Sequence, residues 1–136
     1  MTGKRKGIRL GKMVVLAFAA LSGSALAKPV MDDKQKCKAA IASYFELSGR
    51  EVNARISVSE QRKSGDYLVT FKKSRQLTFS YLCRTSGNRI VWGDAQEKFG
   101  TMEMSYRLVE SGGIDVSYVD DETMKKNTVS YQLSDL

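Results

Sequence analysis

The sequence predicts an α+β domain in which one N-terminal helix packs on an antiparallel sheet of about six or seven strands in meander order, with one disulfide. Three observations predict this fold. A segment with apolar residues at steps of three and four is followed by short segments in which apolar and polar residues alternate. The connections between those segments are short, which favours antiparallel pairing of consecutive strands. Two cysteines fall on the apolar sides of the helix and of one strand.

The first 27 residues have the pattern of a secretory signal peptide. A basic segment precedes the apolar run Met13–Leu21, which is much shorter than the roughly 20 residues of a membrane span. Ala25 and Ala27 then supply the small residues that signal peptidase accepts. We therefore expect cleavage after Ala27, and a periplasmic or secreted domain of residues 28–136 with no stable membrane span. An uncleaved membrane anchor is the alternative.

Cleavage would change the charge of the chain. The whole chain has 22 basic and 15 acidic residues, and the leader holds five of the basic ones and none of the acidic ones. Residues 28–136 therefore keep 17 basic against 15 acidic residues, a net charge of +2. Nucleic-acid-binding domains are typically far more basic, so we expect no nucleic-acid partner.

Cys37 and Cys83 are the only two cysteines of the chain. In an exported chain an even number of cysteines favours a disulfide, and two cysteines allow one intramolecular pairing. The alternative is a catalytic or metal-binding thiol pair, which the absence of histidine and of a C-x-x-C spacing disfavours.

The predicted helix begins at Asp32 or Asp33, and Gln35 stands three residues after Asp32 as in a capping box. Its apolar or small face comprises Cys37, Ala40, Ile41, Tyr44, Phe45 and Ser48. Gly49 is the expected end of the helix. Cys37 therefore belongs to the buried face.

From Glu51 the period changes to two, which predicts strands with one polar face. The residues expected to face the helix are Val52, Ala54, Ile56 and Val58; Tyr67, Val69 and Phe71; Leu77, Phe79, Tyr81 and Cys83; Met102, Met104, Tyr106 and Leu108; Ile114, Val116 and Tyr118; and Val129, Tyr131 and Leu133. A short strand over residues 89–92 and a longer loop over residues 93–100 lie between the third and fourth of these sets.

The residue types present exclude several chemistries. The chain has no histidine, the commonest general base and metal ligand, and no G-x-S-x-G, P-loop or dinucleotide fingerprint. A catalytic or calcium-binding role for the acidic turn Asp120–Glu122 is disfavoured against a solvated loop. Copper binding by Met102 and Met104 is likewise disfavoured against packing in the core. We expect no enzyme, no catalytic residue, no metal and no cofactor.

Trp92, the only tryptophan, stands at the end of a predicted strand and at the mouth of the longest loop. Tryptophan and arginine are enriched in binding hot spots, so Arg84, Arg89, Trp92 and Phe99 form a candidate partner-binding site. The competing interpretation, which we favour for Trp92, is that it covers one end of the core.

The segment Gln35–Trp92 resembles a PepSY-like unit in its helix KAAIASYF, its strands VNARISVSE and DYLVTF, and the final TSGNRIVW, with Gly87 in the turn. Such modules are exported and associated with inhibition or regulation of proteases. The cysteines and the strands from Thr101 to Leu133 depart from that pattern. A cystatin-like or nuclear-transport-factor-like helix on a curved sheet has a similar outline.

These features predict a small non-enzymatic exported protein that binds another exported or envelope protein, as an inhibitor, an immunity factor or an assembly adaptor. The alternative is a carrier of a lipid or metabolite in a pocket between the helix and a curved sheet. The residues expected to line that pocket are Tyr44, Tyr81, Tyr106 and Tyr118.

Overall fold

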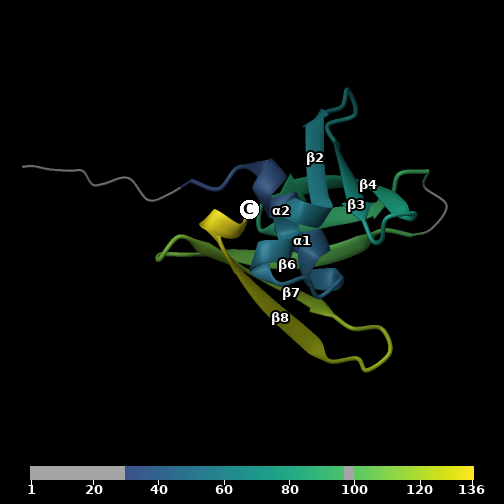
Figure 1. The fold of residues 1–136 in the computed structure, drawn as a ribbon. Coiled ribbons are helices and arrows are strands. Elements are labelled where there is room, and N and C mark those ends of the chain that lie inside the picture. The colour runs from purple at the N-terminus through teal and green to yellow at the C-terminus, as the bar shows by residue number, and fades with distance from the viewer. Residues whose placement is uncertain (1–29, 97–99) are drawn as a thin grey trace, which may run out of the picture. The chain divides into compact units, whose positions relative to one another are not determined.

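In the described residues, seven antiparallel strands form one sheet in which each strand pairs with its neighbours in the sequence (Figure 1). The computed structural model describes residues 30–96 and 100–136, so the expected leader and Phe99 lie outside the described residues. The strands are β2 (Ile56–Gln61), β3 (Tyr67–Lys72), β4 (Thr78–Ser86), β5 (Arg89–Asp94), β6 (Met102–Val109), β7 (Gly113–Val119) and β8 (Lys126–Gln132). The predicted antiparallel meander is therefore confirmed.

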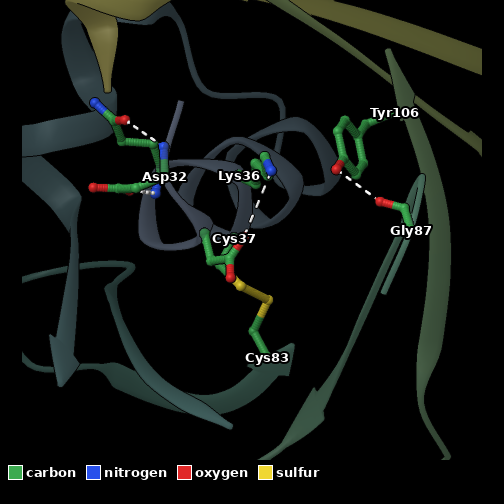
Figure 2. Close-up of polar contacts among 8 residues, drawn as sticks. Asp32, Lys36, Cys37, Cys83, Gly87 and Tyr106 are labelled. Atoms are coloured by element: carbon green, nitrogen blue, oxygen red, sulfur yellow. Dashed lines mark hydrogen bonds and ion pairs between the residues drawn. A yellow bond between two sulfur atoms is a disulfide. The ribbon is translucent and has the colours of Figure 1, made fainter. Parts of the chain in front are cut away.

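Helix α1 (Asp33–Tyr44) covers one face of this sheet, which we call the inner face. The helix begins with the predicted capping box: the Asp32 carboxylate accepts the Gln35 N–H at 2.8 Å, and the Gln35 side chain accepts the Asp32 N–H at 3.0 Å (Figure 2). These two bonds satisfy backbone donors that the first helical turn leaves unpaired. The helix ends at Tyr44, and Glu46 follows in a left-handed conformation with φ of 58°.

The segment after α1 differs from the expectation. We predicted that Gly49 ends the first helix and that a strand starts near Glu51, but residues Gly49–Arg55 form a second helix, α2. The reason is local: the Glu51 carboxylate accepts the N–H and the hydroxyl of Ser48, each at 2.9 Å. This helix-start signature outweighs the alternation of the following residues. The strand consequently begins only at Ile56.

The alternation predicted for the other strands places their apolar residues against α1. Between the helix and the sheet, the side chains that are less than 2% exposed include Ile41, Val52, Val69, Ile90, Met104, Ile114 and Val116, and Phe71 is almost as deeply buried. Two residues are exceptions to the predicted faces. Leu77 precedes β4 and is 44% exposed, and Leu108 lies near the end of β6 and is 46% exposed. The layer between α1 and the sheet is therefore a filled core.

A disulfide joins Cys37 of α1 to Cys83 of β4, as predicted (Figure 2). Both residues are at most 1% exposed. Because Cys37 lies in the first half of α1 and Cys83 on the inner face of a strand, the bond fixes the helix against the sheet at one point.

The C-terminal segment is anchored on the two helices. The Tyr131 hydroxyl donates a hydrogen bond to the Leu47 carbonyl at 2.7 Å, and Lys38 Nζ donates to the Leu136 carbonyl at 2.9 Å. A Cβ atom on Gly49 would lie 2.6 Å from the Asp135 carboxyl group, so a larger residue there would force the Asp135 side chain to move. None of the helices in the described ranges is long and apolar enough to cross a membrane.

Removal of the disulfide with Cys37→Ala/Cys83→Ala is expected to lower the free energy of unfolding by about 4 kcal/mol. The bond links residues 46 positions apart, and the unfolded chain gains conformational entropy when a loop of that length is opened. Urea denaturation followed by circular dichroism measures the change. A loss of less than about 1 kcal/mol would contradict the structural role given to the bond.

Stability is also expected to fall in alkaline solution because of Tyr131. Burial, and then the charge of Asp135, raises the pKa of Tyr131 to about 12, whereas an unfolded tyrosine has a pKa of about 10. Between these values the unfolded chain releases a proton that the folded chain retains, so stability present below about pH 10 is lost as the pH rises, by about 2 kcal/mol. Measurement of the unfolding free energy against pH should show a shallower decrease for Tyr131→Phe. Equal slopes for the two proteins would be the contrary result.

Candidate functional site

The two arginines of the predicted partner site lie on the outer face of the sheet, which is opposite α1. Arg84 and Arg89 alternate with inner residues, and their side chains are 62% and 53% exposed. Arg84 forms an ion pair with Asp66 at 3.3 Å, and Arg89 forms one with Glu103. Each arginine is therefore paired within the chain.

Trp92 lies on the inner face of the sheet. It is 5% exposed and belongs to the core cluster on the inner face. Among the described residues, its Nε1–H has no hydrogen-bond acceptor, so packing and not a polar bond holds the indole in place. The Trp92 side chain therefore packs on the face opposite the two arginines, although Trp92 and Arg84 both line the smaller of the two hollows at the end of β5 and Arg89 does not.

Two hollows lie at the end of β5, one on either side of the segments Trp92–Asp94 and Gly100–Thr101. The smaller one, of about 260 Å³, lies on the outer face beside Arg84 and Asp66. The larger one, of about 650 Å³, lies at the C-terminal end of α1. Both adjoin the region that the sequence singled out around the loop over residues 93–100.

Four aromatic residues line the larger hollow, which we call the aromatic hollow: Tyr44, Phe45, Tyr81 and Trp92. Tyr44 and Phe45 come from the end of α1, whereas Tyr81 and Trp92 are diagonal neighbours on β4 and β5. The Trp92 ring lies edge-to-face with Tyr81 at 5.1 Å and with Tyr44 at 5.3 Å between centroids. The helix end and the sheet therefore build the hollow together.

The rings of the aromatic hollow are held by further contacts with the core. Phe45 stacks on the buried Phe71 with 4.4 Å between centroids, and Tyr44 lies 5.9 Å from the ring of Tyr118. Aromatic pairs at these distances each contribute about 1 kcal/mol. The hollow is consequently formed by the fold itself.

The described residues that line the aromatic hollow include three carboxylates, those of Asp94, Glu103 and Asp121, and no lysine or arginine. Glu103 is neutralised by its ion pair with Arg89. Asp121 projects from a turn that Asp120 fixes by accepting the backbone N–H groups of residues 122 and 123 at 2.8 and 3.1 Å.

The surroundings of Tyr81 in the aromatic hollow shift its pKa. Burial, and then the nearby Asp94 carboxylate and Tyr44, raises the pKa of Tyr81 above its ordinary value. The Tyr81 phenol therefore stays protonated to a higher pH than an exposed tyrosine does.

Exposed apolar side chains gather at the same end of the sheet. The connections β3–β4, β5–β6 and β7–β8 all lie there, at the right of Figure 1. Five large apolar residues are exposed in the described ranges 31–96 and 100–136. Four of them, Tyr44, Leu77, Val119 and Met124, lie at this end, and Leu108 lies at the other. Tyr44 and Val119 also line the aromatic hollow.

The four tyrosines of the carrier interpretation do not share one cavity. Tyr44 and Tyr81 line the aromatic hollow, and Tyr118 packs on Tyr44 from the core. Tyr106 lies elsewhere: its hydroxyl donates to the Gly87 carbonyl at 2.8 Å, and Lys36 Nζ lies 5.2 Å from its ring centroid (Figure 2).

The methionine pair and the acidic turn have separate positions. Met104 is 1% exposed and its sulfur accepts the Ser43 hydroxyl at 3.9 Å, whereas Met102 lines the aromatic hollow. Within residues 30–96 and 100–136, no group of three or more cysteine, aspartate or glutamate side chains is placed to hold a metal ion.

Sequence reasoning found part of this site. It named Trp92 and the adjoining loop, and it placed Tyr44, Phe45 and Tyr81 on faces directed toward the core. It missed the contribution of Val119 and Asp121, because no local pattern indicates that the β7–β8 turn closes beside the end of α1.

Comparison with known proteins adds no relative: no protein-family model, no curated protein and no solved structure matches this chain. The likeness to PepSY-like units therefore rests only on the residues that suggested it. The function of the chain has to be argued from the aromatic hollow and its surroundings.

Proposed function

We propose that the protein is a non-enzymatic exported binding protein, and that its partner is another protein that docks at the end of the sheet where the aromatic hollow opens. One observation carries this proposal: four aromatic side chains line a preformed hollow whose rim includes the exposed residues Tyr44 and Val119. Exposed apolar clusters on a folded chain mark interaction sites.

The form of the hollow favours a protein partner over a small carried ligand. Pockets for small molecules bury most of the ligand surface, which requires an enclosed cavity. The layer between α1 and the sheet is filled by residues such as Phe71 and Ile90, and the aromatic hollow opens at the surface. A protruding side chain of a partner fits such a site, with the surrounding hairpin turns providing the rest of the contact.

The distribution of binding energy over protein interfaces also favours a protein partner. Binding free energy concentrates in a few anchor side chains that fill well-packed pockets, and a stable interface buries about 800 Å² on each partner. The aromatic hollow supplies one such pocket, and Val119 and Asp121 at the β7–β8 connection supply part of its rim. The Cys37–Cys83 disulfide supports an oxidising compartment, where the predicted leader would deliver the chain. The role would then be that of an inhibitor, an immunity factor or an assembly adaptor.

The proposal predicts that one exported protein binds residues 28–136 with the disulfide intact, and that Tyr44→Ala weakens binding at least about tenfold. The protein would be immobilised and exposed to an extract of its own exported compartment, and bound proteins identified by mass spectrometry. Affinities for the captured partner would then be compared among variants. Tyr44 is 42% exposed, so its truncation should spare the fold, whereas truncation of the buried Trp92 would open the core.

Leu108→Ala is the matched control, because Leu108 is 46% exposed but lies at the opposite end of the sheet. Circular dichroism melting curves would verify that both variants are folded. The proposal requires Leu108→Ala to bind like the wild type. Equal binding by Tyr44→Ala and the wild type would place the partner elsewhere, and a catalytic activity of the purified protein would contradict the binding role.

A further inference from the structure

We infer that the protein forms a symmetric dimer in which strand β8 of one copy pairs antiparallel with β8 of a second copy, so that the two sheets become continuous. The inference goes beyond the proposed function, because it concerns the open edge of the sheet, and no described residue of β8 lines the aromatic hollow. It commits this edge to a second copy of the chain and not to a different protein.

Strand β8 is an edge strand with outward backbone groups. It is the last strand of the sheet order and pairs with β7 alone (Figure 1). Just beyond its two ends, the Leu133 N–H donates to the Gly112 carbonyl and the Lys125 carbonyl accepts the Asp120 N–H, so odd-numbered residues face β7. Because the direction alternates along an antiparallel strand, the even-numbered residues direct their N–H and C=O groups away from the sheet. They are Lys126, Thr128, Ser130 and Gln132.

The side chains of β8 leave most of these backbone groups uncovered. The Thr128 hydroxyl lies 2.9 Å from that of Ser117, and the Ser130 hydroxyl donates to Asp115 at 2.6 Å, so both are bonded back to β7. Among the described residues, a side chain bonds to the backbone of β8 only at Gln132, whose N–H donates to the Asp135 carboxylate at 3.0 Å. The middle of the edge is therefore open to another strand.

The opposite edge of the sheet is protected. Strand β2 pairs with β3 at four positions, and its register shifts between Val58 and Gln61. Glu60 lies in the shifted segment, and its carboxylate accepts Lys34 Nζ at 2.9 Å. Irregular pairing and charged side chains both block the addition of a strand. With β8 as the one open edge of the described sheet, pairing between copies closes after two chains and gives a dimer instead of a filament.

The sequence of β8 is complementary to itself when Val129 lies on the two-fold axis. This register pairs all seven residues of the strand, with Thr128 opposite Ser130 of the second copy and Lys126 opposite its Gln132. Lys126 is the only charged residue of the strand, so no like charges meet directly. Thr128 and the opposite Ser130 both direct their backbone groups outward, so the two residues exchange hydrogen bonds. Hydroxyl side chains are also favourable cross-strand neighbours.

The dimer also completes the burial of Val129. In one copy this residue is partly exposed, packs against the core cluster and lies opposite the buried Val116 of β7. In the dimer the two Val129 side chains form a non-hydrogen-bonded pair, in which the side chains of antiparallel strands lie closest. Pairing therefore removes apolar surface from water that one copy alone leaves exposed.

Sedimentation velocity of residues 28–136 with the disulfide intact tests for the dimer. Pairing of two short strands gives a small interface, and small interfaces are weak. We therefore expect a monomer at about 1 µM protein and mostly dimer at about 300 µM. A chain that stays monomeric throughout this range overturns the inference.

Thr128→Lys should weaken the dimer at least about tenfold, because the added lysines of the two copies lie diagonally across the two-fold axis and repel each other. Ser57→Lys is the matched control: it adds the same charge at an exposed position of β2, on the other edge, and should dimerise like the wild type. Circular dichroism melting curves verify that both variants are folded. Equal dimerisation by Thr128→Lys, or loss of the dimer in Ser57→Lys, contradicts pairing through β8.

Val129→Cys tests the register. Position 129 lies on the two-fold axis, so the new thiol meets its own counterpart at a distance that a disulfide spans. Mild oxidation at about 300 µM should then give a covalent dimer in non-reducing electrophoresis, whereas Ser57→Cys should stay monomeric. The native Cys37–Cys83 bond is at most 1% exposed and is shielded from exchange. No covalent dimer from Val129→Cys, or as much from Ser57→Cys, would show that the register is wrong.

Discussion

The bond between Cys37 and Cys83 is the constraint on which the rest of the structure depends. It fixes the first half of α1 to the inner face of β4. Tyr44 follows two helical turns after Cys37, about 10 Å along the helix axis, and Tyr81 lies two residues before Cys83 on the same strand face. The same bond therefore stabilises the fold and brings Tyr44 toward Tyr81 at the end of the sheet, where the aromatic hollow forms.

The outer face of the sheet differs in its side chains from the end where the aromatic hollow opens, which we call the hollow end. On the outer face polar groups satisfy one another: Asp115 accepts Arg107 at 2.8 Å and the Ser130 hydroxyl at 2.6 Å, which also lowers the pKa of Asp115. At the hollow end, the apolar side chains of Tyr44 and Val119 stay exposed although burial would stabilise them. This contrast supports the proposal that a partner docks at the end of the sheet where the aromatic hollow opens.

Much of the fold could be predicted because period-two alternation and the positions of two cysteines are global signals that agree with each other. Helix α2 was missed because one local interaction, the bonding of Ser48 to Glu51, outweighs an alternating pattern. Strand parity alone could have separated Arg89 from Trp92, since an odd spacing places them on opposite faces. The hollow itself could not be predicted, because Val119 and Asp121 reach it only through tertiary packing.

Site-specific photocrosslinking tests the central claim most directly. A benzophenone amino acid would replace Val119, on the rim of the aromatic hollow, and in a second protein Leu108, at the far end. Both would be irradiated in cells that produce the protein, and the attached residue would be mapped by tandem mass spectrometry. The account predicts that only the protein labelled at position 119 joins one partner. Equal crosslinking from both positions, or from neither, would contradict it.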